Sequence, residues 1–195
     1  MPFGGYVLVG GKSSRFGRDK ALLEVPGGLL FSRVAEAVRQ AAGDVVLVGS
    51  PEKYGGLGLR VIPDAVAGVG PLGGILAALE DSAHEWNLIA ACDMPGVRAD
   101  FLGFLLGRTA RFAGDLVLPI NRDGMPEPLC AVYRRGAAKA IRRSIEAGVY
   151  KITRAFEGLE TVAIQAEEYA AFDPGGRLFA NVNTAEEARQ AGLLI

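Results

Sequence analysis

The chain alternates short apolar or β-branched runs with longer segments of helical period, and this alternation restricts its fold more than any other feature. Such an order is typical of an α/β domain in which helices connect largely parallel strands. The pattern predicts strands at residues 6–9, 45–48, 60–63, 88–92, 116–120 and 129–133. It predicts helices at residues 31–42, 72–81, 99–108, 137–147 and 184–190.

The size and charge of the chain favour one domain that does not bind nucleic acid. With 195 residues, of which 50% are hydrophobic, the chain can bury one sizeable core. Single domains commonly have roughly 50 to 250 residues, so residues 1–195 are expected to form one domain. The formal net charge is −1, which excludes the broad positive field that attracts nucleic acid.

The sequence also indicates a cytoplasmic protein that makes no membrane contact. No apolar run approaches the roughly 20 residues of a membrane span, and the first residues lack the charged start of a secretory signal. Cys92 and Cys130 lie inside apolar runs, which predicts buried thiols in a reducing compartment. His84 is the one histidine, so a zinc-type cluster of histidine and cysteine ligands is excluded.

The loop VGGKSSRFGRDKALL, which follows the first predicted strand, is the strongest candidate for a phosphate site. Successive backbone N–H groups in a glycine-rich loop can bind an anion, and Arg15 and Lys20 can add full positive charge. A surface loop with solvated charges is the alternative explanation. The loop therefore predicts binding of a phosphorylated ligand, although such a motif alone is not specific.

Two common nucleotide motifs fail in this sequence on spacing. The GKS in this loop resembles the end of a P-loop, but the glycine that a P-loop requires is replaced by Tyr6, inside the strand. Gly68, Gly70 and Gly73 fit the dinucleotide pattern, with Asp93 about 20 residues further on. However, residues 64–67 separate the strand from Gly68, where the pattern requires a tight turn. A dinucleotide fold is thus a poor second choice.

Asp64 and Asp93 each follow a predicted strand. The carboxyl ends of strands are where open α/β sheets bind ligands, and Mg²⁺ prefers oxygen ligands and substrate phosphates. Either aspartate could instead cap the helix that follows it. We expect Asp93, in CDMP, to be the metal ligand, since it directly follows the apolar run NLIAAC at the carboxyl end of a predicted central strand.

Two later segments hold weaker candidates. MPEPLCAVY contains Glu127, although the segment could simply be the start of a strand. In FANVNTAEEA, Asn183 directly precedes the capping box of the last predicted helix, so its role could be structural. Asn181 has no such structural role, and its amide oxygen could complete a metal shell with Asp93.

The motifs together resemble those of the molybdenum cofactor guanylyltransferases. VLVGGKSSRFGRDKALL is similar to the family signature, which reads roughly L-A-G-G-x-S-x-R-M-G-x-D-K. Further matches follow in order along the chain: GPLGGI at 70–75, CDMP at 92–95, EPLCAVY at 127–133 and NVNTAEE at 181–187. The resemblance implies a three-layer nucleotide-diphospho-sugar-transferase-like (Rossmann-like) fold with a mostly parallel central sheet.

That resemblance implies a nucleotidyltransferase that uses Mg²⁺ to transfer GMP from GTP to molybdopterin and releases pyrophosphate. The resemblance also implies possible contacts with other cofactor-biosynthesis proteins or with acceptor proteins. The catalytic positions that it implies are Arg15, Lys20 and Asp93, with Asp93 on the metal. The nucleotide-binding positions are Leu8, Val9, Gly10, Gly11, Lys20, Asp64 and Asp93, and the substrate-binding positions are Asn181 and Asn183.

The sequence departs from the family pattern at a few positions. Val9 replaces the usual alanine, Phe16 the usual methionine and Ala185 a frequent proline. Val48 stands where some relatives have an asparagine that contacts the nucleotide, so one polar contact to the base is in question.

Two other functions remain open from the sequence. The nearest is cytidylyl transfer, or transfer to another phosphorylated small molecule. The cytidylyl branch usually has L-A-A-G in the first loop, whereas Gly10 here replaces that second alanine and leaves room for a purine. The other is a nucleotide-binding regulator without turnover, against which the intact Arg15, Lys20, Asp64 and Asp93 argue.

Overall fold

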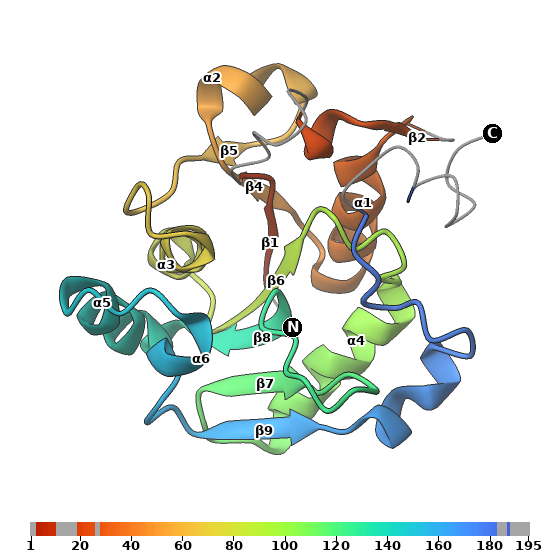
Figure 1. Cartoon of the computed structure of the whole chain (residues 1–195), viewed down its shortest axis with the longest axis vertical. Helices are drawn as coiled ribbons and strands as arrows, with labels where there is room; N and C mark the ends of the chain where they lie inside the picture. Colours follow the sequence, from red (N-terminus) through yellow and green to blue (C-terminus); the bar gives the residue numbers. More distant parts are fainter. Residues whose placement is uncertain (1–2, 11–18, 26–27, 183–186, 188–195) are drawn as a thin grey trace.

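A computed structural model of the chain describes residues 3–10, 19–25, 28–182 and 187 (Figure 1). Its main sheet has seven strands in the order β5-β4-β1-β6-β8-β7-β9. The strands of this sheet are β1 (Gly4–Leu8), β4 (Val46–Val48), β5 (Val61–Ile62), β6 (Trp86–Ala91), β7 (Leu116–Pro119), β8 (Cys130–Arg134) and β9 (Thr161–Ile164). A separate hairpin pairs β2 (Glu24–Val25) with β3 (Gly28–Leu29).

The sheet is mostly parallel, as predicted. β1 pairs in parallel with β4 and β6, β4 with β5, and β7 with β9. β8 alone runs antiparallel to both of its neighbours, β6 and β7. The connection from β7 to β8, residues 120–129, folds back on itself through a bridge between Ile120 and Pro126. It contains no crossover helix, so β8 pairs with β7 in the antiparallel sense.

Helices cover both faces of the sheet and form the two outer layers (Figure 1). Those helices are α1 (Leu30–Ala42), α2 (Pro51–Tyr54), α3 (Pro71–Asp81), α4 (Ala99–Arg108), α5 (Ala138–Glu146) and α6 (Ile152–Ala155). Helices α1 and α4 pack together on one face, and α3 and α5 pack together on the other. The predicted fold class is confirmed: three layers with a mostly parallel central sheet.

The long periodic elements agree with the predicted ranges to within about two residues, a normal spread for element boundaries. The predictions missed the short elements: the β2–β3 hairpin, α2, α6 and β9. These have too few residues to show a period, and β9 lies at the sheet edge, with only Ile164 of its four residues buried. Of the helix predicted at 184–190, only Glu187 lies within the described residues, and it is helical.

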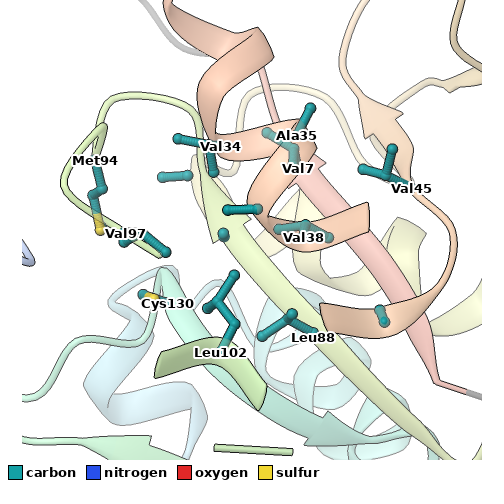
Figure 2. Close-up of a cluster of buried hydrophobic side chains, with 14 of the residues drawn as sticks. Val7, Val34, Ala35, Val38, Val45, Leu88, Met94, Val97, Leu102 and Cys130 are labelled. Carbon is teal, nitrogen blue, oxygen red and sulfur yellow. The ribbon is translucent and has the colours of Figure 1, made fainter. Parts of the chain in front are cut away.

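The strand β1 alternates its side chains between two cores. Val7 enters the cluster with α1 and α4, and Tyr6 and Leu8 enter the cluster with α3. Figure 2 shows the first cluster, in which Val7 lies near Val34 and Val38 of α1. Burying one such aliphatic side chain stabilises the fold by about 1.5–3 kcal/mol, so β1 is anchored on both faces.

The two cysteines are buried, as predicted. Neither forms a disulfide, and burial raises the pKa of the Cys92 thiol to about 12. Burial also raises the pKa of Cys130. Within the described residues, no helix has the length and apolar character that crossing a membrane requires.

At some glycines an added methyl group would overlap neighbouring atoms, and at others it would meet none. Comparing an alanine substitution at each kind of position tests the packing of the core. A methyl group on Gly5 of β1 would overlap the carbonyl oxygen of Asp44 and lie 2.8 Å from Val38 Cγ1. Gly103, in α4, has nothing within 4 Å of the same position. We expect Gly5→Ala to lower the free energy of unfolding by about 1–3 kcal/mol. We expect Gly103→Ala to raise it by about 0.5–1 kcal/mol, as measured by urea denaturation. Equal effects would contradict the packing of β1 against α1.

Candidate active site

The candidate site lies at the edge of the sheet where β1, β5 and β6 end. Parallel pairing brings these carboxyl ends together, and it continues for one residue beyond two of the strands. Val9 N donates to Val48 O at 2.9 Å, and Cys92 N donates to Leu8 O at 3.1 Å. The side chains of Leu8 and Val9 are buried, while Gly10 is exposed. These predicted nucleotide contacts can therefore be made only through the backbone and Gly10.

Lys20 and Asp93 meet at this edge. Lys20 Nζ lies 3.9 Å from Asp93 Oδ2, and the side chains are 31% and 25% exposed. Burial raises the pKa of Asp93, and the charge of Lys20 offsets part of that rise. The structure thus brings together two predicted catalytic residues that are 73 positions apart, in a partly desolvated setting where charge acts strongly. Arg15 and Gly11 lie outside the described residues.

Asp64 lies between the loop after β1 and the first turn of α3. A methyl group on Gly10 would lie 3.9 Å from Asp64 Oδ2, and one on Gly74 would lie 3.1 Å from Asp64 Oδ1. Desolvation raises the pKa of Asp64, although the residue as a whole is exposed. The carboxylate therefore faces the space beside Gly10, where the resemblance implies the nucleotide.

Neither aspartate caps the following helix, which was the alternative explanation for both. The N-cap of α4 is Arg98, and the N-cap of α3 is Gly70. Gly70 has a φ of 66°, a conformation that favours glycine. With the caps supplied by other residues, Asp64 and Asp93 are available for ligands.

The segment that contains Asn181 runs beside Asp93. Val182 N donates to the backbone oxygen of Asp93 at 2.8 Å, and the Val182 side chain is buried against Val25 and Leu30. Asn181 itself is exposed. The structure therefore brings Asn181 to the candidate site, whereas Asn183 lies outside the described residues.

Two other positions from the sequence analysis, Glu127 and Val48, lie beside β8 and in β4. Glu127 precedes β8, and Leu129 O accepts from Ala91 N at 2.7 Å, at the end of β6. Burial raises the pKa of Glu127, while a hydrogen bond from Asn121 opposes that rise. Val48 is 1% exposed and points into the core, so its side chain could not contact a nucleotide base. The side chain at position 48 therefore does not reach the nucleotide, and the contact that an asparagine makes in some relatives is not available there.

The sequence analysis missed Tyr54, which contacts both Val9 and Asp19 at this site. Asp19 directly precedes Lys20 in the signature loop, so the sequence motif could have indicated it. Tyr54 is 35 residues from Asp19 and belongs to the missed helix α2, so no local pattern indicated it.

Oxygen ligands for a cation are present at the site, although the described residues contain no group of three or more His, Cys, Asp or Glu that could hold a metal ion. Mg²⁺ needs only one or two carboxylates when substrate phosphates and water supply its other ligands. The Asp93 carboxylate, desolvated and only partly compensated by Lys20, fits that requirement.

One hollow of the described surface lies away from this edge of the sheet. It has a volume of about 550 Å³ and lies between α5 and α6, lined by residues that include Arg143, Val149 and Arg154. None of the predicted site residues lines it. This hollow is therefore separate from the carboxylates, the lysine and the glycines at the strand ends.

Comparison with known proteins found relatives that match over nearly the whole chain. The family described as "MobA-like NTP transferase domain" matches residues 5–162. A probable molybdenum cofactor guanylyltransferase of Pelotomaculum thermopropionicum is 34% identical over 191 residues, which are 97% of this chain and 92% of the relative. The crystal structure of molybdopterin-guanine dinucleotide biosynthesis protein A from Archaeoglobus fulgidus is 31% identical, with a TM-score of 0.81. That match covers 97% of this chain and 96% of the other.

The fold alone is shared more widely. The crystal structure of 2-C-methyl-D-erythritol 4-phosphate cytidylyltransferase from Thermus thermophilus has a TM-score of 0.69 at 15% identity. The match covers 98% of this chain and 97% of that one. At this identity the likeness concerns the fold and carries no information on the nucleotide.

Gly73 gives a test of how α3 positions the Asp64 loop. Gly73 O accepts from Ala65 N at 3.1 Å, and a methyl group on Gly73 would overlap the carbonyl oxygen of Val66. We expect Gly73→Ala to displace the loop and to lower the free energy of unfolding by about 1–3 kcal/mol. Amide hydrogen exchange should be faster in residues 64–66 than in the Gly103→Ala control. Unchanged exchange there would show that α3 does not hold the loop.

Proposed function

Because the chain belongs to the MobA-like NTP transferase family and is therefore a nucleotidyltransferase, we propose that it transfers GMP from GTP to molybdopterin. The observation that carries the proposal is the approach of Lys20 to Asp93 beside the signature loop. This pairs a phosphate-binding cation with a metal-binding carboxylate. Relatives matched over nearly their whole length are named for the same activity, which supports the choice of nucleotide and acceptor.

The proposed reaction requires little covalent chemistry from the protein. An oxygen of the terminal phosphate of molybdopterin attacks the α-phosphorus of GTP, and the bond between that phosphorus and the oxygen that bridges to the β-phosphate breaks. Pyrophosphate leaves with the electron pair. No general base or enzyme-bound intermediate is needed, since the acceptor oxygen is already a nucleophile. In-line positioning and neutralisation of charge then supply most of the catalysis.

Each candidate residue has a role in this proposal. Lys20 and Arg15 stabilise the departing pyrophosphate through charge-assisted hydrogen bonds. The backbone of Leu8, Val9, Gly10 and Gly11 and the carboxylate of Asp64 line the nucleotide side. The amides Asn181 and Asn183 face the pterin. The approach of Lys20 to Asp93 and the position of Asp64 beside Gly10 support this division, and the other roles rest on the family resemblance.

We also propose Mg²⁺ as the cofactor, held by Asp93, with a further oxygen from Asn181. A bound Mg²⁺ would neutralise part of the negative charge of the nucleotide phosphates. The chain itself supplies the carboxylate, keeps it partly desolvated and positions Lys20 beside it. The proposal extends to a single nucleotidyltransferase domain over residues 1–195 that acts in the cytoplasm, where buried free thiols such as Cys92 stay reduced.

The direct test is incubation of the protein with GTP, Mg²⁺ and molybdopterin, followed by mass analysis of the pterin product. We expect a mass increase that corresponds to one GMP, together with release of pyrophosphate. A protein that binds GTP but releases no pyrophosphate would be the regulator considered above. A product that carries CMP from CTP, with none from GTP, would show the cytidylyl alternative.

Replacing Asp93 tests its assignment as a ligand. We expect Asp93→Ala to lower kcat by at least about a hundredfold, because the metal would lose its protein carboxylate. The melting temperature should change by only a few degrees. Asp100→Ala is a matched control, since Asp100 accepts from Phe101 N at 2.8 Å and lies at the start of α4. That control should lose up to about 1 kcal/mol of stability, because an acidic side chain in the first turn of a helix is favourable, and it should keep its activity. Full activity in folded Asp93→Ala would refute the assignment.

Gly10 tests the choice of base. Among the described residues, the atoms nearest to a methyl group on Gly10 would be Gly49 Cα at 3.8 Å and Asp64 Oδ2 at 3.9 Å, so Gly10→Ala should fold normally and only reduce the room beside the loop. We expect the wild-type kcat/KM to be higher for GTP than for CTP. Gly10→Ala should lower the GTP value by roughly tenfold and affect CTP less, because a purine needs more room. A wild-type CTP value equal to or above that for GTP would contradict guanylyl transfer.

A further inference from the structure

The hydroxyl group of Tyr54 joins the two segments that flank residues 10–18. Its oxygen lies 2.6 Å from the carbonyl oxygen of Val9 and 2.6 Å from Asp19 Oδ2. Val9 directly precedes Gly10, and Asp19 directly precedes Lys20. Tyr54 is the last residue of α2, which follows β4. A single side chain from a third segment thus contacts both ends of the signature loop.

Asp19 accepts from several protein donors at once. Besides the Tyr54 hydroxyl, it pairs with Lys53 Nζ, and its Oδ1 accepts from Ala21 N at 3.0 Å. Burial, which leaves the side chain 9% exposed, acts to raise the pKa of Asp19. The hydrogen bonds from Lys53, Tyr54 and Ala21 outweigh that effect and hold the pKa below its usual value. Asp19 is therefore an ionised, satisfied group, and it forms the N-cap of the 3₁₀ turn Lys20–Leu22.

The ring of Tyr54 is fixed as firmly as its hydroxyl. Tyr54 is 2% exposed, and its pKa is raised by burial and by Asp19, so the hydroxyl keeps its proton. A methyl group on Gly49 would lie 2.9 Å from Tyr54 Cε2 and 2.9 Å from Val9 Cγ2. Glycine at position 49 therefore allows the ring to lie against the end of β1.

We propose that Tyr54 is a positioning residue for the nucleotide site, acting through Asp19 on Lys20. Val9, Asp19, Lys53 and Tyr54 are called the Tyr54 clasp. The clasp sets where the chain leaves β1 and where it begins the turn that carries Lys20. It thereby fixes the ammonium of Lys20 near Asp93 before the ligand binds, which lowers the cost of organising the site. The inference rests on the proposed function only in naming GTP as the ligand.

The chain contains a matched control for a purely structural tyrosine. Tyr6 is 3% exposed, and its hydroxyl donates to Asp81 Oδ2 at 3.0 Å. Asp81 in turn pairs with Arg60, so the arrangement of hydroxyl, carboxylate and cation is the same as in the clasp. Arg60 precedes β5 and Asp81 ends α3, which places this group at the edge of the sheet opposite the site. Loss of either hydroxyl removes one hydrogen bond to a carboxylate, but only one of them is near Lys20.

The test compares Tyr54→Phe with Tyr6→Phe. We expect Tyr54→Phe to raise the dissociation constant and the KM for GTP by roughly tenfold, since each misplaced charge-assisted contact is worth about that much. The dissociation constant for GMP and the KM for the acceptor should change little, because Lys20 is assigned to the outer phosphates. Tyr6→Phe should show a similar change in melting temperature and an unchanged affinity for GTP. Equal GTP affinities in the two variants would overturn the proposal.

Two further measurements keep the result decisive. Lys53→Gln removes the cation of the clasp. The Lys53 side chain is 51% exposed, so this variant should fold even if Tyr54→Phe does not. Like Tyr54→Phe, it should raise the dissociation constant for GTP. Amide hydrogen exchange of residues 19–22, measured without nucleotide, should be faster in either clasp variant than in Tyr6→Phe. Unchanged exchange and unchanged binding in Lys53→Gln would count against the clasp. Binding is measured with whichever of GTP and CTP the wild-type protein binds, so failure of guanylyl transfer is distinguishable from failure of the clasp.

Discussion

Parallel pairing of β1 with β4 and β6 is the constraint on which the rest of the molecule depends. It makes three segments leave the sheet at one level, so that Gly10, Gly49 and Asp93 reach the same edge. Helices cover both faces, and β1 alternates Val7 into one core with Leu8 into the other. A shift of one residue would exchange these side chains and bury neither set correctly. The geometry of the site therefore follows from the same burial that stabilises the sheet.

The carboxylates at this edge differ in how far protein donors satisfy them, and this separates structural from functional groups. The Asp19 side chain is less exposed than that of Asp93. Its pKa is nevertheless lowered, because Lys53, Tyr54 and Ala21 all donate to it. For Asp64 and Asp93, burial prevails and the pKa is raised. A desolvated carboxylate with few donors is stabilised when a cation or a ligand donor arrives, which is typical of functional sites. Asp19 needs no such ligand, and its role is to hold the chain.

Periodicity was sufficient to predict the layers and the long elements, because strands such as β6 and helices such as α1 have enough residues to show a pattern. The signature loop and the position of Asp93 after a strand predicted which edge holds the site. The antiparallel β8 and the short α2 were not predictable in this way, since their placement depends on contacts between distant segments. Tyr54 is the clearest case: its two partners are 45 and 35 residues away, and only the folded chain brings them together.

The choice of base depends on a few residues around Gly10 and not on the fold as a whole. The crystal structure of a cytidylyltransferase shares this fold with a TM-score of 0.69 at 15% identity, and that likeness concerns the fold alone. At the end of β4, Val48 points into the core and Gly49 has no side chain, so neither residue offers a polar side chain to a base. A methyl group on Gly10 would lie 3.8 Å from Gly49 Cα and 3.9 Å from Asp64 Oδ2. In the proposed function, the backbone at the end of β1 and the Asp64 carboxylate therefore line the nucleotide side together. The pairing of β1 thus sets the backbone on the nucleotide side, whereas the proposed Tyr54 clasp acts on the outer phosphates through Lys20.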